Sequence, residues 1–91
     1  MKPTQKQKEM RSKAKAIEIS MQIGKNGITD TVIEQIKKQL DSRELVKIKA
    51  LKSAVENSTM KEIIEKIALK TDSELIDSIG FTFTVYRKKR H

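Results

Sequence analysis

The sequence has no cysteine and no tryptophan, and it contains one histidine, one tyrosine and two phenylalanines among its 91 residues. Without cysteine, neither a disulfide bond nor a thiolate metal site can form, which is compatible with a reducing compartment. The one histidine is the terminal residue, His91, where nothing holds it in place for acid–base or triad chemistry. The few aromatic rings leave little surface for stacking against bases or sugars.

Long apolar runs are also missing. No stretch approaches the roughly 18 apolar residues of a membrane helix, and the N-terminus lacks the apolar core of a secretory signal. We therefore expect a cytoplasmic protein with no membrane partner. The length suits a single domain over residues 1–91. Twelve isoleucines, five leucines and four valines predict a small aliphatic core.

The sequence offers no group of residues typical of an enzyme or a metal site. Asp72, Glu74 and Asp77 are close together in the chain, but their spacing does not match a calcium-binding loop. The G-x-x-x-x-G-K-[ST] spacing of a Walker phosphate loop is absent. We therefore expect no enzymatic activity, no bound metal and no cofactor.

The positive charge is concentrated at the two ends of the chain. The formal net charge is +8. Residues 1–15 hold six basic side chains and one acid, and residues 87–91 hold four basic side chains and no acid. Residues 16–86 are nearly balanced, with ten basic and eleven acidic groups. This distribution favours a polyanionic partner, because lysine and arginine release counterions when they contact phosphates. The alternative is that the charged ends only confer solubility.

The periodicity of apolar residues predicts seven elements in the order α-β-α-β-α-β-β. Polar residues at the helix starts provide caps: Thr4 for the first helix, Thr29 for the second, and Asn57 or Ser58 for the third. The last two strands are expected to turn near Gly80, with Phe81, Phe83 and Val85 on one face. The predicted ranges are helix 4–15, strand 18–23, helix 30–41, strand 44–51, a helix ending near residue 70, strand 74–79 and strand 81–87.

This order predicts an α/β fold. Strands separated by helices are expected to be parallel neighbours, and the last two strands should be antiparallel. Clean alternation in the strands indicates that helices cover mainly one face of the sheet. The other face is expected to present six polar side chains to solvent: Ser20, Gln22, Lys47, Lys49, Thr82 and Thr84.

The candidate binding motif is Gly24-Lys25-Asn26-Gly27, between a predicted strand and a helix start. Its glycines permit a tight turn and a close approach of another backbone. The following helix offers unpaired N–H groups and the positive end of its dipole, which bind anions. Lys25 adds a mobile cation, and Asn26 can donate to a phosphate or ribose oxygen. G-x-x-G loops clamp nucleic-acid backbone in KH domains. The alternative is a plain strand-to-helix turn.

Four stretches in order resemble the CRM family (chloroplast RNA splicing and ribosome maturation), in its stand-alone YhbY type. The matching stretches are residues 21–29, which hold MQIGKNGIT, residues 43–49, which hold RELVKIK, the turn glycine Gly80, and the pair Tyr86-Arg87. Two departures are modest, because Ile28 replaces the usual leucine and Thr71-Asp72-Ser73 replaces a stretch that often contains glycine.

The resemblance implies a four-stranded mixed sheet, similar to the C-terminal domain of a bacterial translation initiation factor. It also implies binding to structured RNA, and for stand-alone members an association with precursors of the large ribosomal subunit during ribosome assembly. Plant relatives act in group II intron splicing. We expect RNA to be the partner of a monomeric chain, with ribosomal proteins as further partners. The expected RNA-binding residues are Gly24, Lys25, Asn26, Gly27, Lys13, Lys15, Arg87, Lys88, Lys89 and Arg90.

The sequence leaves two interpretations open for several residues and more than one for the function. Lys47 and Lys49 are either secondary RNA contacts or solubilising residues, and Tyr86 either stacks on a base or packs in the fold. A protein-interaction module that docks a ribosomal protein or assembly factor on its open sheet face is the main alternative function. A DNA-binding domain is a second one, although no segment resembles a helix-turn-helix.

Overall fold

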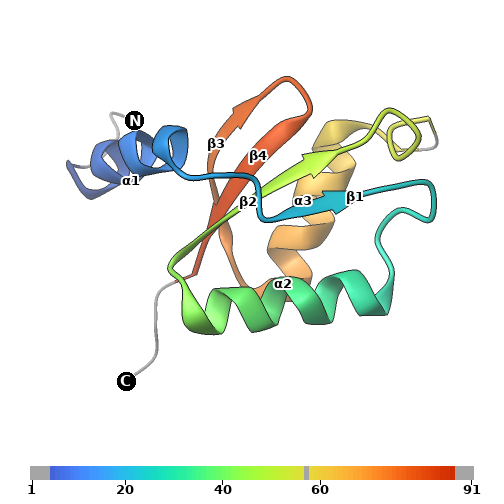
Figure 1. Cartoon of the computed structure of the whole chain (residues 1–91), viewed down its shortest axis with the longest axis horizontal. Helices are drawn as coiled ribbons and strands as arrows, with labels where there is room; N and C mark the ends of the chain where they lie inside the picture. Colours follow the sequence, from blue (N-terminus) through green and yellow to red (C-terminus); the bar gives the residue numbers. More distant parts are fainter. Residues whose placement is uncertain (1–4, 57, 88–91) are drawn as a thin grey trace.

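The computed structural model describes residues 5–56 and 58–87 (Figure 1). The elements follow the predicted order α-β-α-β-α-β-β. They are α1 (Gln5–Ala16), β1 (Met21–Ile23), α2 (Asp30–Ser42), β2 (Leu45–Ala50), α3 (Met60–Thr71), β3 (Glu74–Ile79) and β4 (Thr82–Tyr86). The predicted cap Thr4 lies outside the described residues. Within the described part of the chain, none of the helices has the length and apolarity needed to span a bilayer.

The caps of α2 and α3 come from threonines. Thr29 caps α2 as predicted, since its side-chain oxygen accepts a hydrogen bond from the Val32 N–H. For α3 the prediction of Asn57 or Ser58 is wrong, because Thr59 is the cap. The side-chain oxygen of Thr59 accepts a hydrogen bond from the Glu62 N–H, and the same hydroxyl donates one to the Glu62 carboxylate. Only Thr59 has a glutamate three residues later, and that pairing fixes where the helix begins.

The four strands form one mixed sheet in the order β1-β2-β4-β3. β1 is parallel to β2, and β3 is antiparallel to β4, as predicted for these two pairs. β4 is also antiparallel to β2, its other neighbour. The prediction that β2 and β3 are neighbours is wrong, because β4 lies between them. Four of the five β4 residues are buried, whereas Ile76 is the one buried residue of β3. The more apolar strand takes the central position, and β3 forms the edge.

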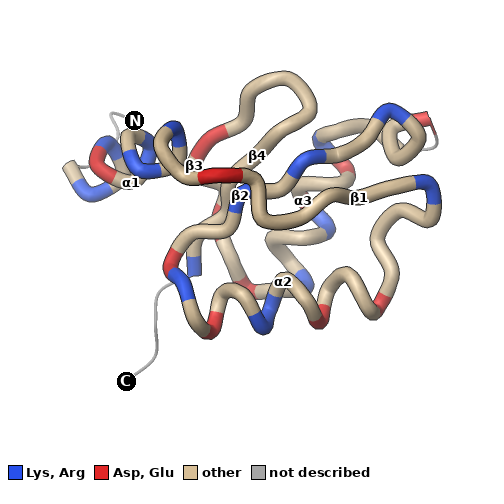
Figure 2. Tube along the Cα trace, in the orientation of Figure 1, with Lys and Arg blue, Asp and Glu red and all other residues tan. Residues whose placement is uncertain are grey.

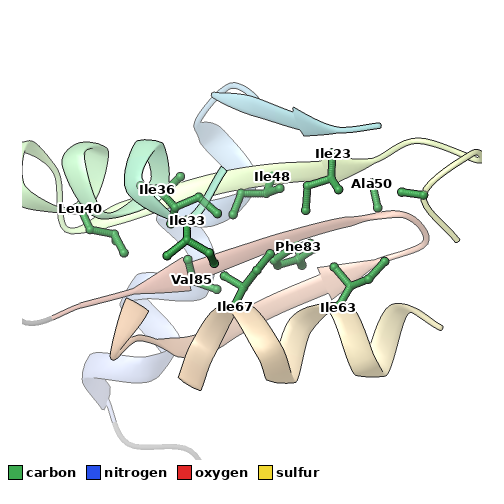
Figure 3. Close-up of a cluster of buried hydrophobic side chains, with 12 residues drawn as sticks. Ile23, Ile33, Ile36, Leu40, Ile48, Ala50, Ile63, Ile67, Phe83 and Val85 are labelled. Carbon is green, nitrogen blue, oxygen red and sulfur yellow. The ribbon is translucent and has the colours of Figure 1, made fainter. Parts of the chain in front are cut away.

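The main core lies between the sheet and the pair α2 and α3 (Figure 3). The predicted apolar faces of both helices are confirmed, since Ile33, Ile36 and Leu40 of α2 and Ile63 and Ile67 of α3 are buried. On the sheet side they meet Ile23, Val46, Ile48, Ala50, Phe83 and Val85. Phe81 does not continue this row as expected. It lies in the β3–β4 turn with 51% of its surface exposed.

The second face of the sheet is partly covered by α1. Met10 and Ala14 are buried in a small cluster with Ile76, Tyr86 and the half-buried Leu45. The prediction that this whole face is open to solvent is therefore wrong. Of its six polar residues, Gln22 and Lys49 are exposed, Ser20, Lys47 and Thr82 are half-buried, and Thr84 is buried.

A bulge in β3 lets two consecutive residues share this second face. The register pairs Leu75 with Val85 and Asp77 with Thr84, so Ile76 is the extra residue. Such a bulge re-aims side chains that would otherwise alternate between faces. Ile76 therefore packs beneath α1 while Asp77 lies opposite Thr84 on the same side of the sheet.

Candidate nucleic-acid interface

The Gly24–Gly27 loop is a tight turn at the end of β1. The Gly27 N–H donates to the Gly24 carbonyl over 2.9 Å and closes the turn. Gly27 has a φ of +68°, a conformation that side chains rarely adopt, and a Cβ there would meet no atom within 4 Å. At Gly24 a Cβ would make ordinary contact with Leu51 at 3.9 Å. Lys25 and Asn26 are exposed at the tip, where an incoming phosphate can reach them.

The start of α2 follows this loop directly, but the protein already occupies part of it. The Val32 N–H donates to Thr29, and Asp30 puts a carboxylate in the first turn. A carboxylate at this position stabilises the helix dipole and competes with an external anion. The exposed Lys25 is therefore a better candidate for an anion contact than the start of α2.

Two hydrogen bonds bring three connections of the chain to the same end of the sheet. The Leu51 N–H donates to the Ile23 carbonyl over 2.8 Å, and the Ala50 N–H donates to the Phe81 carbonyl over 2.7 Å. The β1–α2 loop, the β2–α3 connection and the β3–β4 turn consequently meet there (Figure 1). Figure 2 shows basic residues on the β1–α2 loop and on the β2–α3 connection at this end.

This arrangement adds two residues to the candidate site, Lys52 and Phe81. Neither was among the binding residues predicted from the sequence. Lys52 is exposed just after β2, and Lys49 is exposed near its end. Lys52 could have been found, because the carboxyl ends of two parallel strands lie at the same edge of a sheet. Phe81 lies at the tip because it forms the two-residue turn together with Gly80, whose φ is +60°. No sequence pattern distinguishes this exposed phenylalanine from an inward strand residue.

Tyr86 has the packing role that was one of its two interpretations. Only 6% of its surface is exposed, and it lies under α1 in the second cluster. The Lys6 ammonium is 5.5 Å from the centre of its ring, within the range of a cation–π contact. Its ring is therefore not available for stacking on a base.

The predicted contacts on α1 lie apart from the loop. Lys13 and Lys15 are exposed in the last turn of α1. Figure 1 shows α1 and the β1–α2 loop on opposite sides of the molecule, with the sheet between them. Any RNA that contacts both must therefore extend along the sheet.

Arg87 is bound to the protein itself. Its guanidinium forms an ion pair with Asp41 and donates to the carbonyls of Lys37 and Thr71 over 3.3 and 3.4 Å. These contacts join the end of β4 to α2 and α3. RNA binding by Arg87 stays a prediction, and it would have to use the remaining donors. Lys88, Lys89 and Arg90 lie outside the described residues.

Replacing Arg87 by alanine should lower the free energy of unfolding by about 1–3 kcal/mol, because three protein acceptors lose a charged donor. Asp41 is largely exposed, so most of this effect should come from the two carbonyls. Denaturant unfolding measures the change, and Arg43→Ala, which removes an exposed arginine, is the control. Equal stability of the two variants would contradict the structural role. A separate loss of RNA affinity in folded Arg87→Ala would support the predicted contact.

Known proteins are similar to this chain over nearly its whole length. The model of the CRS1/YhbY (CRM) domain matches residues 3–87. The chain is 34% identical over 88 residues to the "Probable RNA-binding protein YqeI" of Bacillus subtilis, covering 96% of this chain and 90% of YqeI. It is 36% identical over 89 residues to the "Probable RNA-binding protein MJ0652" of Methanocaldococcus jannaschii, covering 97% of this chain and 66% of that protein.

A solved structure shows the same fold. The solution structure of the hypothetical protein SAV1595 from Staphylococcus aureus is similar to this chain with a TM-score of 0.77 at 34% identity, covering 100% of this chain and 93% of that one. The resemblance seen in the sequence is thus confirmed over nearly the whole chain. The protein belongs to the CRS1/YhbY (CRM) domain family.

Proposed function

We propose that this protein binds structured RNA, namely precursor large-subunit ribosomal RNA, during ribosome assembly. The observation that supports this is that the β1–α2 loop and the β2–α3 connection lie at the same end of the sheet, with Lys25, Lys49 and Lys52 exposed on or next to them. The net charge of +8 and two relatives named as probable RNA-binding proteins support it. Residues 1–91 act in this proposal as one monomeric, non-catalytic domain in the cytoplasm.

The proposed mechanism is electrostatic and based on shape. Lys25 and the loop N–H groups hold one or two phosphates, and Lys52 and Lys49 extend the contact across the end of the sheet. Each lysine that neutralises a phosphate releases a counterion, so affinity falls as salt rises. Lys13, Lys15 and the basic residues 87–90 continue the contact along a folded RNA. With Tyr86 buried, a row of stacked bases on the sheet, as in RRM domains, is not part of this mechanism.

Lys25→Ala should weaken binding to large-subunit ribosomal RNA and reduce the slope of log K against log salt by about one. The matched control is Lys66→Ala, which removes the same charge from the exposed side of α3. Titrations between about 50 and 300 mM salt measure the slope. Equal slopes for the two variants would place the phosphate contact away from the loop.

Competition between nucleic acids tests the proposal as a whole. We expect a preference for large-subunit ribosomal RNA over duplex DNA and a homopolymer RNA that persists at the high-salt end. Equal and steeply salt-dependent binding to all three would mean that the basic ends act only as a polyanion trap. RNA-independent association with a ribosomal protein would instead favour the protein-interaction alternative.

A further inference from the structure

A groove lies on the second face of the sheet, beside the part that α1 covers. Its volume is about 380 Å³. The floor comes from β2 and β4, one side from the end of α1 and the segment before β1, and the other side from β3. The lining residues are Lys15, Ile19, Lys47, Asp77, Ile79, Thr82 and Thr84. A volume of this size exceeds that of one nucleobase and falls within the range of small-ligand sites.

One charged side chain of this groove has no partner among residues 5–56 and 58–87. The half-buried Asp77 carboxylate, placed opposite Thr84 by the β3 bulge, has neither a hydrogen bond nor an ion pair there. Thr84 lines the same groove. Burying a charge further is costly unless it gains hydrogen bonds, so the groove fits a ligand that brings N–H donors to Asp77.

The charges of the groove are arranged for a ligand with both donors and acceptors. Lys47 donates to the carbonyls of Ala14 and Ile17 over 3.1 and 3.4 Å, which uses two of its three protons. Lys47 and Asp77 line the same groove but are not paired with each other. Asp77 repels a phosphate and accepts hydrogen bonds from N–H groups, whereas the third Lys47 proton can bond a carbonyl oxygen.

The sides of the groove are apolar. Ile19 and Ile79 are 44% and 64% exposed and lie on opposite sides of the floor. Either aliphatic surface can pack against one face of a flat ring. Lys15 at the rim is exposed and can reach the phosphate attached to that ring. An RNA strand has this combination of a flat polar ring and an adjacent anion, so charge complementarity favours it over a peptide.

We propose that the groove binds one unpaired guanine of the RNA, an inference that rests on the proposed function. The Watson–Crick edge of guanine carries two adjacent N–H donors, at N1 and N2, which match the two oxygens of Asp77. Its O6 accepts from Lys47 or Thr84. Adenine and cytosine each offer a single exocyclic amine to the carboxylate. Uracil has one N–H between two carbonyl oxygens, which the carboxylate repels, so it should bind worst.

The experiment uses one RNA hairpin with a single unpaired position that holds G, A, C or U. For the wild-type chain we expect affinity for the guanine RNA to exceed that for the uracil RNA by about tenfold or more. Asp77→Asn should reduce this ratio to within about twofold. The control is Glu74→Gln, which removes the same charge from the exposed far end of β3 and should leave the ratio unchanged. Circular dichroism verifies that each variant is folded.

Thr84→Val provides a second variant of nearly the same shape, and it should lower affinity for the guanine RNA without changing binding to the uracil RNA. Equal wild-type affinity for the four RNAs, still dependent on Lys25, would overturn the guanine site and leave the proposed RNA binding standing. The same G-to-U ratio in Asp77→Asn as in wild type would also overturn the site. Absence of binding to every RNA by the wild-type chain would overturn both proposals.

Discussion

Phe83→Ala is expected to lower the free energy of unfolding by about 3–5 kcal/mol. Phe83 is 1% exposed in the central strand β4, and it packs in the cluster that joins the sheet to α2 and α3 (Figure 3). Its removal leaves a cavity that helices on a rigid sheet fill poorly. Small domains have a total stability of about 5–15 kcal/mol, and short chains fall near the lower end. The variant should therefore be partly unfolded at 25 °C.

Phe81→Ala is the matched control, because it makes the same chemical change two residues earlier at an exposed position. Phe81→Ala should lower the free energy of unfolding by less than about 1 kcal/mol. Denaturant unfolding followed by circular dichroism measures both variants, provided that each unfolds in a single transition. If Phe81→Ala lowered the free energy of unfolding as much as Phe83→Ala, the phenylalanine in the turn would also belong to the core.

Gly27→Asp should abolish most RNA binding while leaving the fold intact. The left-handed conformation at Gly27 is one that aspartate and asparagine tolerate better than other side chains, and the added Cβ meets no neighbour within 4 Å. The new carboxylate would lie where we propose that a phosphate binds. Repulsion between two such charges at the protein surface is worth one to a few kcal/mol, so affinity should fall about tenfold or more.

Gly27→Asn separates charge from shape, since asparagine has nearly the same size and the same tolerance of positive φ. We expect the affinities in the order wild type, Gly27→Asn, Lys25→Ala, Gly27→Asp, from strongest to weakest, in the same ribosomal RNA titration. If Gly27→Asp and Gly27→Asn bind alike, the loop does not face a phosphate. Thermal unfolding of both variants confirms that any difference arises in the folded protein.

Much of the fold was predictable because local patterns determine it. The alternation in β2 and the apolar faces of α2 and α3 gave the correct buried residues. In β4 the alternation gave Phe83 and Val85 correctly, but Thr84 is also buried and Phe81 is exposed. Neighbour relations were harder, because alternation identifies a face and not the strand beside it. The placement of β4 between β2 and β3 follows from the different burial of the two strands. Similarly, α1 has only Met10 and Ala14 as buried residues, too few to indicate which face of the sheet it would cover.

The candidate site was predictable in part for the same reason. The turn of Gly24 to Gly27 has a local signature, so its position was found from the sequence. The partners of Arg87 could not be predicted from the sequence, because Asp41 and Lys37 are 46 and 50 residues away in the chain. The groove was also hidden, because the β3 bulge changes the direction of Asp77 and the alternation rule assumes that strands have no bulge.

The central position of β4 also determines when the protein can fold during synthesis. β3 has no other partner in the sheet, and β2 gains its second neighbour only from β4. A growing chain that stops before Thr82 lacks Phe83 and Val85, and its two helices would face half a sheet with an open apolar surface. Contacts between β2 and β4 join residues 33 to 41 positions apart, which makes their formation a late and entropically costly step. Nascent chains of this protein should therefore remain sensitive to protease until β4 leaves the ribosome.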